Sequence, residues 1–169
     1  MKKIDYINDR EIFTPLWQRG CECMERVSVT PSSELLHYDS SNLVTQVLHD
    51  LVRNIAAFNG NGEFAVVVLS PDPFNYFHRH FGKYPGFIVE PQHTDDDFFE
   101  ILMTDPGDSP ADAIGLYSER YAVLPLSGSW FLYADRGWNG GTGVLGGPPN
   151  VMEFARQRFR FYENPDRLF

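Results

Sequence analysis

The stretch GTGVLG, Gly141 to Gly146, has the residue types and spacing of a nucleotide-binding glycine loop, G-x-G-x-x-G. Such a loop follows a strand directly and opens a helix whose first N–H groups bind phosphate. Here DRGWNG separates it from the strand-like SWFLYA, and Pro148-Pro149 would fall inside the required helix, where proline is costly. A kinase-type loop needs a lysine on the next strand, and no lysine follows Lys83. We therefore interpret GTGVLG as a turn and predict no cofactor.

Histidines and aspartates form the second group with chemical potential. His78, His80 and His93, followed by the run Asp95, Asp96 and Asp97, are all ligand types for zinc or iron. Side chains at i and i+2 share one side of a strand but point about 200° apart on a helix, which is what we expect around His78. The favoured interpretation packs one histidine among phenylalanines and leaves another in solvent. A metal-dependent enzyme using the His78/His80/His93 region remains the alternative.

Cys21 and Cys23, the chain's two cysteines, are separated by one residue. With no further cysteine they give no disulfide framework, and a structural zinc site normally needs four ligands. Reduced thiols are the favoured interpretation. Recruitment of other ligands across the fold, or a Cys–His nucleophile pair, stays open.

Acidic residues gather in one region of a chain whose formal net charge is −9. Members of this group are Asp95, Asp96, Asp97, Asp105, Asp108 and Asp112. The run lacks the alternating oxygens and defined glycine of a calcium loop, so it indicates either solvated loops or an acidic surface that attracts a basic macromolecule. The charge also repels phosphate backbones, so we predict a basic protein partner and no nucleic acid.

The elements that must position these residues belong to a single globular domain, residues 1–169. Apolar residues at helical spacing predict an amphipathic helix over about 41–58, capped by Ser40 or Ser41 and ended by Gly60. The run Phe64 to Leu69 predicts a buried central strand. Asp72 is expected to cap a short helix that starts with Pro73 and ends at Gly82.

Further strands are joined by short, turn-rich connections, which favour antiparallel pairing. The strand candidates are Phe87 to Glu90, Phe98 to Met103, Tyr121 to Leu124 and Ser129 to Ala134. A helical turn is expected within Ser109 to Arg120, and a C-terminal helix over about 150–160, capped by Asn150. The predicted fold class is α+β with a mainly antiparallel sheet.

The N-terminal residues carry no apolar signal-peptide core, and no run approaches the ~20 apolar residues of a membrane span. We therefore expect a cytoplasmic protein with no membrane partner.

The segment YAVLPLSGSWFLYADRGWNGGTGVL, Tyr121 to Leu145, resembles a segment of small bacterial immunity proteins of polymorphic and contact-dependent toxin systems. In that pattern a Gly-x-Trp begins a strand and an Asp-Arg pair closes it before another apolar strand. Gly128, Trp130, Asp135 and Arg136 occupy the matching places. The chain departs from the pattern where glycines replace the expected apolar strand.

The resemblance implies a non-enzymatic protein that binds and neutralises a toxin domain in the producing cell. Interfaces of that kind depend on Trp, Tyr and Arg anchors and on complementary charge. Asp135, Arg136 and Trp138 are therefore candidate partner-binding residues, together with Asp95, Asp96, Asp97, Asp105 and Asp108. The competing interpretation is structural: Asp135 pairs with Arg136 or a backbone amide, and Trp138 caps the core. A structural subunit or small-ligand module built around Phe74 to Phe87 is a further alternative, and the oligomeric state stays open.

Overall fold

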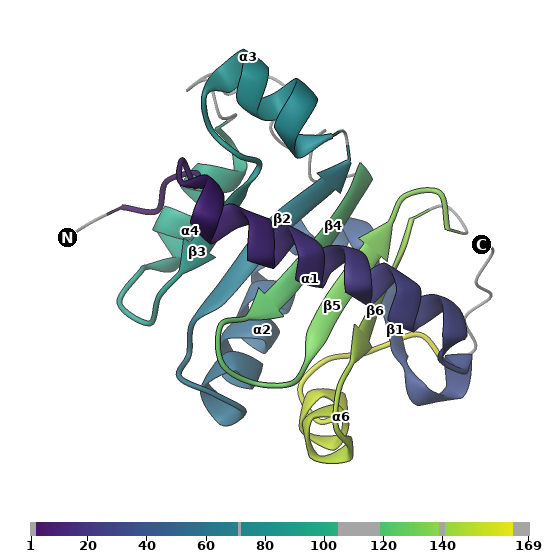
Figure 1. The fold of residues 1–169 in the computed structure, drawn as a ribbon. Coiled ribbons are helices and arrows are strands. Elements are labelled where there is room, and N and C mark those ends of the chain that lie inside the picture. Colours follow the sequence, from purple (N-terminus) through teal and green to yellow (C-terminus); the bar gives the residue numbers. More distant parts are fainter. Residues whose placement is uncertain (1–2, 71, 105–118, 139–140, 164–169) are drawn as a thin grey trace.

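The computed structural model describes residues 3–70, 72–104, 119–138 and 141–163. These residues build a six-stranded antiparallel sheet with the strand order β1-β6-β5-β4-β2-β3 (Figure 1). The strands are β1 (Leu36–Asp39), β2 (Phe64–Ser70), β3 (Gly86–Val89), β4 (Arg120–Pro125), β5 (Phe131–Asp135) and β6 (Thr142–Gly146). The predicted α+β class with a mainly antiparallel sheet is confirmed. The helical turn predicted within Ser109 to Arg120 lies mostly outside the described residues.

Helices cover both faces of the sheet, which gives the domain three layers. Helix α1 (Arg10–Val29) crosses one face, as Figure 1 shows, and packs on inward residues such as Ala65, Val67 and Tyr133. The opposite face carries α2 (Gln46–Phe58), α4 (Asp95–Leu102) and α6 (Pro149–Arg156) over Val66, Val123 and Leu132. The central strands are therefore buried on both sides.

Helix α1 was not predicted from the sequence, although its buried residues recur at helical spacing. They are Phe13, Leu16, Gly20, Cys23 and Val27. Pro15 inside the helix and Gly20 both weigh against a helix locally. Gly20 has a packing role, because a Cβ there would lie 2.7 Å from Cδ2 of Leu69 on β2. Tertiary packing thus overrides the local signal.

The interpretation of GTGVLG as a turn is wrong, because Thr142–Gly146 forms the buried strand β6 between β1 and β5. Its glycines make room for aromatic rings on the neighbouring strands. A Cβ at Gly143 would lie 2.4 Å from Cζ of Tyr38, and one at Gly146 would lie 2.4 Å from Cζ of Phe131. A buried strand therefore follows Asp135 and Arg136, and its two glycines leave space for the neighbouring rings.

The predicted strand Phe98 to Met103 is also wrong, because α4 occupies Asp95–Leu102. Thr94 and Asp97 form a reciprocal capping box, in which each side chain accepts the other's backbone N–H. Phe98, Ile101 and Leu102 then lie on one buried helical face. The cap and the helical spacing outweigh the aromatic and β-branched composition.

Two predicted helices are present with different ends. The segment 41–58 divides into a 3₁₀ turn, Ser40–Val44, and α2, whose N-cap is Thr45 instead of Ser40 or Ser41. The C-terminal helix is shorter than predicted, and its N-cap is Pro148 instead of Asn150. The cap at Asp72 and the left-handed end at Gly82 are confirmed, around a π-helical turn Pro73–His78 and α3 (Arg79–Phe81).

In the described part of the chain, no helix is long and apolar enough to cross a membrane.

Candidate functional site

The aspartate run predicted to bind a partner forms the first turn of α4. Asp95, Asp96 and Asp97 all lie at this N-terminus, where the helix dipole favours negative charge. Asp96 is exposed, while Asp95 and Asp97 are partly buried. The backbone N–H of Thr94 donates to Asp97 and holds the pKa of that carboxyl below its usual value. Asp97 thus belongs to the cap, and Asp96 faces solvent.

Asp95 joins α4 to α2 through a polar cluster. Its Oδ1 lies 3.1 Å from Nε2 of His49 and 3.4 Å from Nε of Arg53. Its Oδ2 accepts a 3.0 Å hydrogen bond from Nε2 of Gln46, whose amide also donates to Asp50 at 2.8 Å. Arg53 additionally donates to the carbonyl oxygen of His93. The cluster brings carboxylates from both helices to one surface.

His49 anchors this cluster from below, with a side chain that is 0% exposed. Its ring stacks on Phe98, with centroids 3.9 Å apart, and its Nε2 accepts a 3.0 Å hydrogen bond from Nε of Arg53. Burial, reinforced by the Arg53 charge, lowers the pKa of His49 to about 4, against an opposing contribution from Asp95. The imidazole is therefore neutral at pH 7.

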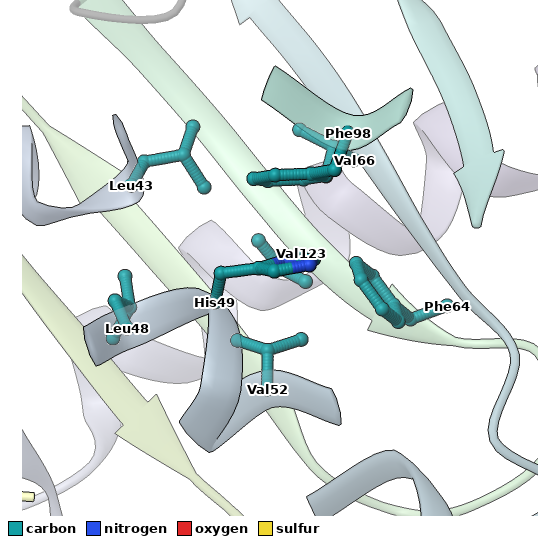
Figure 2. Close-up of a pocket in the computed structure, with 8 residues that line it drawn as sticks. All are labelled: Leu43, Leu48, His49, Val52, Phe64, Val66, Phe98 and Val123. Carbon is teal, nitrogen blue, oxygen red and sulfur yellow. The ribbon is translucent and has the colours of Figure 1, made fainter. Parts of the chain in front are cut away.

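A small cavity lies beside the His49 ring. Figure 2 shows the faces of His49 and Phe98 lying against each other, with Phe64 and Val52 nearby. Among the described residues, Nδ1 of His49 has no hydrogen-bond partner. The cavity leaves about 10 Å³ for the centre of a water-sized sphere, enough for about one water molecule. It is far below the volume of a small-molecule site, so the chemistry of this region lies on its surface.

The surface of α2 and α4, which we call the α2/α4 acidic surface, is strongly negative. Its acidic members are Asp50, Asp95, Asp96, Asp97 and Glu100, and its cations are Arg53 and Lys3. Lys3 pairs with Glu100 at 3.1 Å, with both side chains mostly exposed. Because His49 is neutral, it does not offset the negative charge. The surface combines exposed carboxylates with a rigid two-helix base.

The second predicted group lies at the end of β5, next to the opposite face of the sheet. Asp135 forms an ion pair with Arg120 at 3.1 Å, and its Oδ1 accepts a hydrogen bond from the backbone N–H of Gly137. Arg136 is exposed and pairs with Glu119 at 3.1 Å. Trp138 is 7% exposed and lies with its ring 5.1 Å from that of Tyr133. Arg136 is thus the exposed member of this group and is paired with Glu119, whereas Trp138 belongs to the core.

The structure does not bring α4 and the end of β5 together as one site, because they lie next to opposite faces of the sheet. Asp105 and Asp108, also predicted to bind a partner, lie outside the described residues. The α2/α4 acidic surface and the end of β5 therefore carry three of the predicted residues each.

The metal-ligand candidates are dispersed. His78 stacks on Tyr84, His80 lies against Tyr76, and Nδ1 of His93 accepts a hydrogen bond from the backbone N–H of Glu90. Across residues 3–70, 72–104, 119–138 and 141–163, no group of three or more His, Cys, Asp or Glu side chains is arranged to hold a metal ion.

The cysteines lie on different sides of α1. Cys23 is buried, and burial raises the pKa of its thiol to about 12. Cys21 is half-buried, and burial together with Glu25 raises its pKa as well. Neither thiol has the lowered pKa that activates a cysteine nucleophile.

Sequence reasoning missed the role of His49. The signal for His49 was its place between Leu48 and Val52 on the apolar face of α2. A histidine within such a face needs a polar partner when buried; Arg53 donates to its Nε2, and Asp95, 46 residues away in the chain, lies 3.1 Å from the same nitrogen. The pairing itself is a tertiary contact with no local sequence signal.

No protein-family model, no curated protein and no solved structure matches this chain.

Proposed function

We propose that this protein is a non-enzymatic, cytoplasmic protein-binding domain of the immunity type, which binds and neutralises a basic partner such as a toxin domain. The observation that carries the proposal is the α2/α4 acidic surface, where Gln46 and His49 of α2 contact Asp50 and Asp95 while Asp96 is exposed beside them. The resemblance of Tyr121 to Leu145 to immunity proteins supports the same class.

The chemistry of this surface suits binding better than catalysis. Exposed carboxylates accelerate encounter with a basic partner and select it by charge. The neutral His49 maintains the negative field, since its protonation would place a cation directly below Asp95. The adjoining cavity has room for about one water molecule, so no substrate enters there.

Co-expression with the protein encoded by the neighbouring gene tests the proposal. We expect a stable complex on co-purification and protection of the cell from the toxicity of that partner. The absence of both a complex and protection would contradict the proposal.

A pair of charge variants locates the contact. Asp50→Asn with Asp96→Asn removes exposed charge from the α2/α4 acidic surface and leaves the Asp95 cluster in place. Glu11→Gln with Glu25→Gln removes the same charge from exposed positions of α1, across the sheet, and serves as the matched control. We expect the first variant to slow association about tenfold at low salt, and the control to change it little. Equal association rates for both variants would place the contact elsewhere.

A further inference from the structure

A separate pocket of about 490 Å³ opens between α1 and α6, where β5 begins and β6 ends. Its volume falls within the range of small-molecule sites. Arg26 of α1 and Arg156 of α6 line it from different elements, and Leu35, Phe131 and Met152 supply apolar wall. The pocket therefore combines fixed cations with an apolar interior.

Arg26 is held over the pocket by an aromatic contact. Its guanidinium carbon lies 5.2 Å from the centroid of the Phe131 ring, in a cation–π arrangement. A guanidinium carries five N–H donors, so this contact leaves donors available for an oxyanion. Among the described residues, no carboxylate forms an ion pair with Arg26.

The guanidinium of Arg156 is also available to bind an anion. Its Nη1 lies 3.7 Å from Oε2 of Glu153, and these side chains are 52% and 64% exposed. An exposed pair at that distance is weak, so a bidentate ligand competes with it. Glu34 is the one carboxylate among the lining residues, which leaves the pocket cationic in a chain of net charge −9.

The start of α6 adds to the positive field. This eight-residue helix begins at Pro149, which lines the pocket, and Pro148 before it provides no side-chain cap. Pro149 has no N–H, and the N–H groups of Val151 and Met152 donate to the carbonyl oxygen of Pro148. The helix start therefore contributes the N–H of Asn150 and the positive end of the dipole. Two arginines, an uncapped helix start and an apolar wall converge on one hollow.

We propose that this pocket binds an organic anion, in which a carboxylate or phosphate group is attached to an apolar body. The oxyanion lies between Arg26 and Arg156, and the apolar body contacts Leu35 and Met152. This site is distinct from the α2/α4 acidic surface and has the opposite charge, so the inference stands or falls independently of the proposed function.

Calorimetric titration with small probes tests this site. Phenyl phosphate and phenylacetate distinguish the phosphate from the carboxylate source, inorganic phosphate tests the anion alone, and benzyl alcohol tests the apolar body alone. We expect phenyl phosphate or phenylacetate to bind at millimolar concentration, more tightly than inorganic phosphate and benzyl alcohol. No binding by either aromatic anion, or equal binding of inorganic phosphate, would overturn the proposal.

Matched arginine variants locate the binding. Arg26→Gln with Arg156→Gln removes the proposed contacts, and Arg10→Gln with Arg158→Gln is the control. Arg10 and Arg158 also lie over phenylalanine rings, at 4.8 Å and 3.5 Å, but do not line the pocket. We expect the first variant to weaken binding about tenfold or more and the control to preserve it. Because Arg156 is half-exposed, Arg156→Gln alone provides a second variant if the double variant is unstable. Equal affinity for the pocket and control variants would refute the assignment.

Discussion

Acidification is expected to destabilise the fold through His49. In the unfolded chain this imidazole titrates at its ordinary pKa of 6.5, whereas burial in the folded chain lowers the pKa to about 4. Between these values the unfolded state binds a proton that the folded state excludes, so stability falls as pH falls. Above pH 7 the contribution is constant, because His49 is neutral in both states.

The size of this effect follows from the two pKa values. Each pH unit below 6.5 lowers the free energy of unfolding by about 1.4 kcal/mol, so the loss at pH 5 is about 2 kcal/mol. The full loss, reached near pH 4, is about 3 kcal/mol. Measurement at pH 5 is preferable because most exposed carboxylates remain ionised there.

Urea unfolding at pH 7.5 and pH 5, followed by the fluorescence of the buried Trp130 and Trp138, measures this difference. His49→Phe removes the titrating group and keeps a ring against Phe98. The control His80→Phe changes an exposed histidine on α3. We expect the loss of stability at pH 5 to be about 2 kcal/mol smaller in His49→Phe than in the wild-type protein and the control. Identical pH dependence in all proteins would refute the buried, neutral state of His49.

Four further variants test the packing and the thiols. Gly143→Ala places a Cβ against the Tyr38 ring and is expected to lower the free energy of unfolding, measured with urea, by about 1–3 kcal/mol. Gly137→Ala is the control and is expected to lower it less, because its Cβ would lie 3.2 Å from the end of the Asp135 side chain. Tyr121→Phe removes a buried 2.7 Å hydrogen bond to the carbonyl oxygen of Ser40 and is expected to cost about 1–3 kcal/mol; an unchanged unfolding midpoint would contradict this. Because burial raises the pKa of Cys23 to about 12, its reaction with a disulfide reagent is expected to be slower than that of Cys21 and to accelerate in urea; Cys21→Ser separates the two phases.

The parts of the fold predicted correctly are those with strong local signals. The run from Phe64 is a continuous apolar stretch, and it forms β2, paired on both sides by β3 and β4. The periodic apolar residues after Thr45 form α2. Asp72 and Gly82 delimit a helical segment through capping chemistry that acts within a few residues.

The failures have tertiary causes. A strand such as β6, with Gly143 and Gly146, looks like a turn until Tyr38 and Phe131 are known to fill the space above these glycines. Helix α1 contains Pro15, and packing of the helix against the sheet offsets the unfavourable helix propensity of this proline. For α4 a local signal was overlooked, since Thr94 and Asp97 have the spacing of a capping box.

The candidate surface shows the same division between local and tertiary information. The charge of the Asp95 to Asp97 run was evident from sequence, but its function depends on what lies beneath it. If His49 had a normal pKa, a fall in pH through the 6–7 range would place a cation beside Asp95 and weaken the negative field. Because burial between α2 and α4 keeps the imidazole neutral, His49 adds little positive charge beside Asp95 as the pH falls from 7 to 5. A basic partner bound at this surface is therefore expected to be retained over that pH range. Release between pH 7 and pH 6 would contradict this expectation. It would mean that protonation of a histidine controls binding, and that the neutral state of His49 does not maintain it.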